Sequence, residues 1–204
     1  MNNLDHIYEK DKSIEGFSTA YLKYLSKVLS EISVDEIAAF IKVLLNAREQ
    51  GTTIYFIGNG GSAATSSHFA NDIAIGTKSF AKPFRAVSLC DNQAILTAIA
   101  NDDGYEKVFS QQLEVLLNDG DIVVAISASG NSPNLIAAVE VAKKKKAFTV
   151  GLTAFDGGEL RNITDISIHI PTEKGEYGPA EDGHMILDHL IGNYLLRIVK
   201  DNYE

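Results

Sequence analysis

From Thr52 onward, short apolar runs alternate with amphipathic segments along the chain. The runs lie at 53–57, 86–89, 121–127, 148–153 and 166–170. Runs of this length, separated by segments with helical periodicity, predict strands that are joined by helical crossovers. Such connections require a mostly parallel sheet with helices on both faces. The pattern therefore predicts a doubly wound α/β sandwich.

Residues 1–50 carry a helical pattern instead. Apolar side chains recur there at three- and four-residue spacing, on one face that needs a partner in the core or in another subunit: Phe17, Tyr21, Tyr24, Leu25 and Val28. A second helix is expected over 34–50, because Ser33 and Glu36 have the spacing of a capping box and Gly51 follows the last periodic residue. We therefore expect a helical extension over 1–50 and one structural unit over 51–204, which ends in an amphipathic helix near 180–200.

Composition narrows the classes of function. The 204 residues include 18 Lys and Arg against 27 Asp and Glu, so the net charge of −9 provides no basic field for nucleic acid or for an anionic membrane. Cys90 is the only cysteine, which excludes an intrachain disulfide and a multi-thiolate zinc site and favours a reducing compartment. Since no apolar run is long enough to span a bilayer, we expect a cytoplasmic protein.

The first candidate for an anion site is the loop at 58–62, with the sequence Gly-Asn-Gly-Gly-Ser. It follows the run at 53–57 and opens a helix. Its glycines allow positive φ and close approach to a ligand, and a helix start offers unpaired N–H groups. Taken alone, the loop is explained equally well as a tight strand-to-helix turn.

The second candidate is the loop at 127–132, with the sequence Ser-Ala-Ser-Gly-Asn-Ser, followed by Pro133 at a first helical position. If the strand order is 2-1-3-4-5, the strands that end at 57 and 127 are neighbours. Both loops then converge on one crevice at the carboxyl edge of the sheet, where open α/β sheets bind ligands. Two converging loops favour a phosphate site over two unrelated turns.

The loop sequences also restrict the kind of phosphate. Neither loop holds Gly-Lys-Ser/Thr, which excludes a nucleoside-triphosphate P-loop on pattern. Gly58, Gly60 and Ala63 nearly satisfy the dinucleotide fingerprint, which expects an acid about 20 residues later. Asp91 lies well beyond that spacing. The serines of the second loop favour a small terminal phosphate.

Titratable side chains follow both loops. His68 and Asp72, four residues apart on one helix face, can share a proton or a metal. A second group begins the last helix: Glu181, Asp182, His184, Asp188 and His189. The plainer interpretation is that these are ordinary helix residues paired with neighbours, such as Asp188 with His184.

The polar stretch 101–104 either caps the crevice or forms a turn. A carboxylate and an imidazole suit aldose–ketose interconversion, which moves a proton between adjacent carbons.

Four stretches, 58–72, 91–113, 121–145 and 151–160, together resemble the SIS (sugar isomerase) domain family, and among its members the phosphoheptose isomerases. The resemblance covers about residues 50 to 200. It implies a flavodoxin-like fold with five parallel strands. It also implies that the N-terminal helices pack in a homotetramer whose sites are completed by neighbouring subunits.

The resemblance assigns substrate and phosphate binding to Asn59, Gly60, Gly61, Ser62, Asp102, Ser127, Ser129, Asn131, Ser132 and Glu181. The family's catalytic and zinc-binding set maps onto His68, Asp72, Glu181 and His189. Within this set Asp72 stands for a glutamate and Glu181 for a glutamine, while Ala128 replaces a threonine hydroxyl of the second loop. Asp72 is expected to be the proton-abstracting base and His189 the acid.

The leading hypothesis is a cytoplasmic isomerase that converts sedoheptulose 7-phosphate into D-glycero-D-manno-heptose 7-phosphate through an enediol. A divalent metal, with zinc as the expected ion, would assist, and the product would serve heptose synthesis for lipopolysaccharide or capsule. Two alternatives remain open at this point: a non-catalytic SIS protein that acts as an adapter or sugar-phosphate sensor, and an isomerase of a different sugar phosphate.

Overall fold

The computed structural model describes residues 1–201 and is built on a single sheet of five strands in the order β2-β1-β3-β4-β5. The strands are β1 (Thr53–Gly58), β2 (Arg85–Ser88), β3 (Ile122–Ser127), β4 (Phe148–Ala154) and β5 (Ile166–Ile170). Every pairing between them is parallel. The doubly wound α/β sandwich and the positions of its strands are as expected from the sequence.

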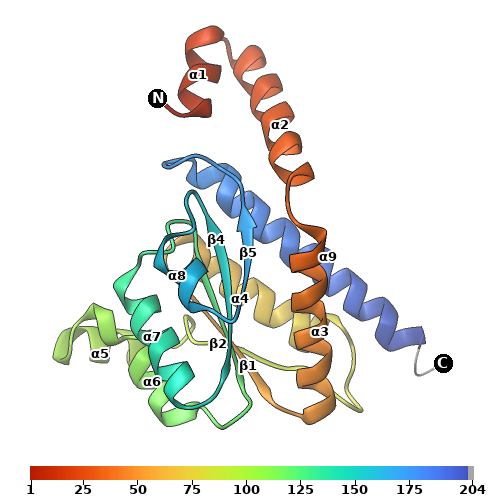
Figure 1. Ribbon diagram of the computed structural model, residues 1–204, viewed down its shortest axis with the longest axis vertical. Helices are drawn as coiled ribbons and strands as arrows, with labels where there is room; N and C mark the ends of the chain where they lie inside the picture. The colour runs from red at the N-terminus through yellow and green to blue at the C-terminus, as the bar shows by residue number, and fades with distance from the viewer. Residues whose placement is uncertain (202–204) are drawn as a thin grey trace.

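Helices cover both faces of the sheet (Figure 1). One face carries α3 (Val34–Gln50), α4 (Gly61–Asn71), the π-helical turn η1 (Asp72–Gly76) and α9 (Tyr177–Asp201). The other carries α5 (Gln93–Asp102), the 3-10 turn η2 (Tyr105–Lys107), α6 (Ser110–Leu116), α7 (Pro133–Lys144) and α8 (Gly158–Ile163). No helix within residues 1–201 combines the length and hydrophobicity needed to cross a bilayer.

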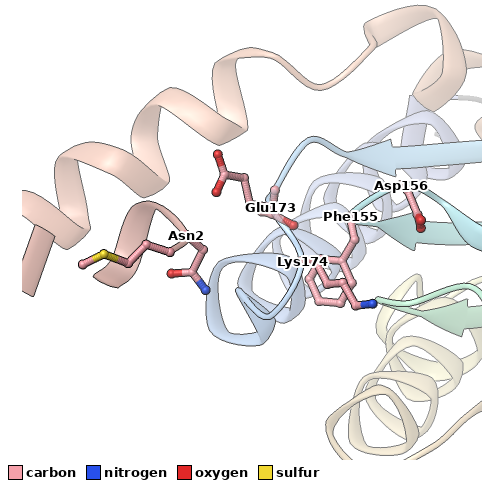
Figure 2. Close-up of a pocket in the computed structure, with 7 residues that line it drawn as sticks. Asn2, Phe155, Asp156, Glu173 and Lys174 are labelled. Atoms are coloured by element: carbon pink, nitrogen blue, oxygen red, sulfur yellow. The ribbon is translucent and has the colours of Figure 1, made fainter. Parts of the chain in front are cut away.

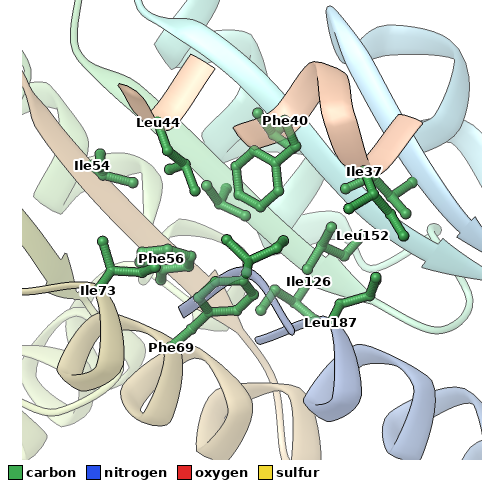
Figure 3. Close-up of a cluster of buried hydrophobic side chains, with 14 of the residues drawn as sticks. Ile37, Phe40, Leu44, Ile54, Phe56, Phe69, Ile73, Ile126, Leu152 and Leu187 are labelled. Atoms are coloured by element: carbon green, nitrogen blue, oxygen red, sulfur yellow. The ribbon is translucent and has the colours of Figure 1, made fainter. Parts of the chain in front are cut away.

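Two hydrophobic cores follow from the alternation of side chains along the strands. Ile54 and Phe56 of β1 face α3, α4 and α9, whereas Tyr55 and Ile57 face the opposite layer. In the first core the ring of Phe69, from α4, stacks on Phe56 with centroids 4.9 Å apart. Figure 3 shows these rings among aliphatic side chains from α3, the sheet and α9. This packing sets the height and rotation of α4 on the sheet.

The N-terminal extension consists of α1 (Asn3–Lys10) and α2 (Ile14–Ser30), which stand out beyond the sandwich in Figure 1. The fully buried carboxylate of Glu176, just before α9, ties both helices to the body of the protein. It accepts hydrogen bonds from the Asn3 amide, at 2.7 Å, and from the Tyr24 hydroxyl. The Tyr21 hydroxyl donates to Asp182 of α9 at 2.8 Å. These bonds fix the extension to the start of α9.

Local details differ from the sequence-based expectations. The capping box at Ser33 forms only by half: the Ser33 hydroxyl accepts from the Glu36 amide, but the Glu36 carboxylate accepts from the His169 amide instead. Strand β5 packs close enough to compete for that carboxylate. Helix α9 begins at Tyr177 rather than near 180, and α5 extends through Asp102 into the expected loop.

His184 lies in the middle of α9 and is completely buried. Its Nε2 lies 3.4 Å from the Thr153 carbonyl oxygen, and its Nδ1 has no hydrogen-bond partner among the described residues. Burial lowers the pKa of this imidazole to about 4, because the charged form would lose its hydration. His184 is therefore a neutral core residue.

We predict that replacing His184 with Leu removes part of the protein's sensitivity to acid. Between about pH 6.5 and pH 4 the imidazole is protonated in the unfolded chain but neutral in the folded chain. The free energy of unfolding is therefore highest above about pH 6.5 and falls as the pH approaches 4. The contribution is roughly 3 kcal/mol from the shift at about 1.4 kcal/mol per pH unit. Urea unfolding at several pH values would measure it, with exposed His6→Leu as control. Equal acid sensitivity in both variants would contradict the assignment.

Candidate functional site

The two glycine- and serine-containing loops meet at the carboxyl edge of the sheet. Strands β1 and β3 are neighbours, with Gly58 in register with Ile126, so both loops begin at the same level. The side-chain amides of Asn59 and Asn134 exchange hydrogen bonds of 2.9 and 2.8 Å between the loops. The convergence expected from the strand order is thus present, and Asn134, in the first turn of α7, is a contact that the sequence did not predict.

The first loop presents the N-terminal end of α4. Gly60 has φ +55°, a left-handed conformation that favours glycine, and Gly61 begins the helix. A Cβ on Gly61 would lie 2.3 Å from Glu181 Oε2, so the carboxylate of Glu181 rests against the helix start where a side chain would otherwise stand. A negative charge is favourable beside the start of a helix, because the helix dipole is positive there.

The second loop gathers hydroxyl groups. The Ser127 hydroxyl accepts from the Gly130 amide at 3.1 Å and lies 3.5 Å from the Ser129 hydroxyl. Gly130 has φ +64° and packs so tightly against the loop after β4 that a Cβ would lie 2.0 Å from the Gly157 carbonyl oxygen. Ser132 stands at the N-cap of α7, with Pro133 at the first helical position as expected.

Two of the predicted binding residues, Asn131 and Asp102, use their side chains in hydrogen bonds to neighbouring protein groups. The Asn131 side chain accepts from the Glu159 amide at 3.0 Å and donates to the Ser129 carbonyl at 3.0 Å, so it braces the second loop against α8. Asp102, exposed at the end of α5, accepts from its neighbour Asn101. Instead, the Tyr105 hydroxyl reaches the first loop, donating to Asn59 Oδ1 at 2.8 Å.

Beside the loops, α4 and α9 bring four titratable side chains together. One oxygen or nitrogen atom from each of His68, Asp72, Asp188 and His189 lies within 4.8 Å of the others. His68 Nδ1 is 2.6 Å from Asp188 Oδ2 and 3.9 Å from Asp72 Oδ2. The His68 and His189 rings meet edge to face with centroids 5.1 Å apart. Asp72 lies where α4 passes into the π-helical turn η1, a distortion frequent at functional sites.

Asp188 is a member of this cluster that the sequence did not predict. The side chain is completely buried and contacts His68, not His184 four residues earlier on the same helix. Burial raises its pKa to about 6, while the hydrogen bond from His68 acts in the opposite direction. The plainer alternative, in which Asp188 pairs with His184, is therefore not what the structure has, because the two side chains contact different neighbours.

The cluster suits a divalent cation. Two imidazoles and two carboxylates form the nitrogen and oxygen donor set that zinc and similar ions accept. Of the predicted ligands, His68, Asp72 and His189 belong to this group. Glu181 does not belong to it and lies against Gly61 instead.

A cavity lies elsewhere, between the start of α1 and the segments after β4 and β5. Its volume is about 470 Å³, and Figure 2 shows Asn2, Phe155, Asp156, Glu173 and Lys174 around it. None of the predicted site residues lines this cavity. We therefore place the candidate site at the two loops and the α4–α9 cluster.

Comparison with known proteins agrees with this geometry. The SIS domain family matches residues 19–154, and the chain belongs to that family. The phosphoheptose isomerase of Geobacter metallireducens is 39% identical over 76% of this chain and 81% of its own length. That of Geobacter sulfurreducens is 36% identical over 85% of this chain and 92% of its own length. The structure of phosphoheptose isomerase from Neisseria gonorrhoeae superposes with a TM-score of 0.81 at 28% identity, covering 90% of this chain and 98% of that one.

We predict that Gly130→Ala disables the second loop. Its positive φ and the backbone oxygen of Gly157 both oppose a methyl group, so we expect a loss of about 2 kcal/mol or more in the free energy of unfolding and a fall of at least about tenfold in affinity for inorganic phosphate. Calorimetric titration would measure binding. Gly51→Ala is the matched control, since φ is +70° there but nothing lies within 4 Å of the added Cβ. Unchanged phosphate affinity in Gly130→Ala would contradict a role for this loop.

Proposed function

We propose that this protein is a phosphosugar aldose–ketose isomerase that converts sedoheptulose 7-phosphate into D-glycero-D-manno-heptose 7-phosphate. The observation that carries the proposal is the convergence of two hydroxyl- and glycine-containing loops beside a histidine and aspartate cluster. The similarity to phosphoheptose isomerases over most of the chain supports the choice of substrate. A cytoplasmic location and a place in heptose synthesis are part of the same proposal.

The two loops have different tasks in this proposal. Ser127, Ser129 and Ser132 offer hydroxyl donors to the phosphate, together with backbone amides at the start of α7 and Ser62 from the first loop. The carboxylate of Glu181, which lies against Gly61, cannot itself bind an anion. It suits sugar hydroxyls instead, since a carboxylate accepts hydrogen bonds from them. Anchoring the phosphate at one end thus orients the open-chain sugar along the crevice toward α9.

The chemistry requires two proton movements. From the ketose, Asp72 takes a proton from carbon 1 to give an enediol and returns it to carbon 2. The proton on oxygen 1 is lost and oxygen 2 gains one, a transfer that His189 mediates as acid and base. Asp72 Oδ2 lies 3.9 Å from His68 Nδ1, so the base stands beside a second imidazole.

A divalent cation, with zinc as the expected ion, belongs to the proposal. His68, Asp72 and His189 would hold it, and Glu181, the fourth predicted ligand, would have to leave Gly61 to join them. A bound divalent ion supplies polarisation of the sugar's carbonyl and hydroxyl oxygens. Ion binding is measurable by calorimetry without any turnover.

A homotetramer with shared sites is also proposed. Ile14 and Leu22 expose 82% and 66% of their surface on α2, and such apolar exposure on a helix held out from the body favours burial against another copy. Light scattering coupled to size exclusion would give the mass. A monomer at micromolar concentration would contradict this part of the proposal.

The decisive experiment is incubation of the purified protein with sedoheptulose 7-phosphate and zinc, followed by NMR for aldose signals. Conversion supports the proposal. Binding of the sugar phosphate without conversion, by an intact oligomer, would overturn it in favour of the non-catalytic sensor or adapter. Conversion of a different ketose phosphate only would retain the reaction and change the substrate.

We predict that Asp72→Asn lowers kcat by about 10²- to 10⁴-fold, because the amide cannot accept the proton. KM should change little, since phosphate anchoring is remote from Asp72. Steady-state kinetics would separate the two parameters. Asp119→Asn serves as control, because within residues 1–201 the only ion pair of that exposed carboxylate is with Lys146, 3.9 Å away at the other edge of the sheet. An active Asp72→Asn enzyme would exclude Asp72 as the base.

A further inference from the structure

Among the described residues, Asp188 makes one side-chain hydrogen bond, to His68. Its side chain has no exposed surface, and Oδ2 lies 2.6 Å from His68 Nδ1. The other oxygen, Oδ1, is buried without a hydrogen-bond partner among the described residues. Burying a carboxylate with one oxygen unpaired lowers the free energy of unfolding, so packing alone does not explain this residue.

Within residues 1–201, His68 is the one group that is hydrogen-bonded to this carboxylate, and His189 attracts it without a hydrogen bond. His184, on the same helix, contacts the Thr153 carbonyl, and Asp72 is acidic and repels Asp188. His189 lies edge to face with His68. The short distance of 2.6 Å between Asp188 Oδ2 and His68 Nδ1 is typical of a strong hydrogen bond between a carboxylate and an N–H group.

We propose that Asp188 is a positioning residue that holds the His68 imidazole in one orientation and in the tautomer with its proton on Nδ1. A carboxylate can only accept, so the 2.6 Å contact requires the proton on the ring nitrogen that faces it. Nε2 then keeps its lone pair. The His68 side chain is 43% exposed, so its free edge is available to substrate or cation while the other is locked against the core.

The inference deepens the proposed function, because a fixed lone pair on Nε2 is what a ligand or a proton acceptor at this site needs. Its effect on turnover rests on that function. The orientation of the ring does not, since it follows from contacts within the folded chain.

The test is the tautomer of His68 in the full-length protein, read from long-range ¹H–¹⁵N NMR after treatment with EDTA, above the ordinary imidazole pKa of about 6.5. We expect the Nδ1–H form in the wild type. We expect the same form in Asp188→Asn, whose amide oxygen can still accept, and a mixture in Asp188→Leu. Asp121→Asn, a buried aspartate at the opposite edge of the sheet, is the matched control and should leave His68 unchanged.

Zinc affinity is the second measurement, by calorimetry on the same variants. We expect Asp188→Leu to bind zinc about 10- to 100-fold more weakly and Asp188→Asn to retain most of the affinity. An Nε2–H form in the wild type, or the same tautomer in Asp188→Leu, would overturn the proposal. So would an Asn variant that keeps the tautomer but loses zinc as fully as the Leu variant, since Asp188 would then be a ligand.

The two hypotheses fail separately. A protein that holds the Nδ1–H tautomer but converts no sugar phosphate would contradict the proposed function and leave the role of Asp188 intact. Circular dichroism would show whether Asp188→Leu is folded. If it is not, the tautomers of the wild type and Asp188→Asn still decide the question, since loss of the Nδ1–H form in either contradicts the proposal.

Discussion

The contact of α4 with α9 on one face of the sheet is the interaction on which the site depends. Phe69 of α4 and Leu187 of α9 both enter the same hydrophobic core, which fixes the rotation of each helix. Their sequence neighbours, His68 and Asp188, are thereby turned into the seam between the helices. Core packing thus does more than stabilise the fold, because it determines which titratable groups meet.

The same layer joins the site to the N-terminal extension. Helix α9 carries Asp182, which accepts from Tyr21, only one residue after Glu181 at the head of α4. Just before the helix, Glu176 holds α1 and α2. The start of α9 therefore contacts the N-terminal extension, and the middle of the same helix carries residues of the candidate site.

Periodicity was enough to predict the strands and a parallel sheet, because alternating apolar runs and amphipathic segments leave few other choices. The meeting of the two loops was predicted on the condition that the strand order is 2-1-3-4-5, and the structure has that order. The four-residue spacing of His68 and Asp72 was likewise enough to predict that they share one helix face. The pairing of His68 with Asp188 was not predictable, since it depends on how two distant helices cross. Likewise, the Glu36 side chain accepts a hydrogen bond from β5 and the Asn131 side chain accepts one from α8. Neither bond was predictable, because polar side chains bind nearby unpaired backbone groups that a local sequence motif does not reveal.

The position of Glu181 has a consequence for how a phosphorylated ligand arrives. Its carboxylate lies near those of Asp72 and Asp188 in a chain whose net charge is −9, so a dianion diffusing in meets repulsion until it reaches the amides of the second loop. Dissolved ions screen that repulsion beyond about 8 Å at physiological ionic strength. Encounter should accordingly be faster in saline than in dilute buffer, the reverse of electrostatic steering.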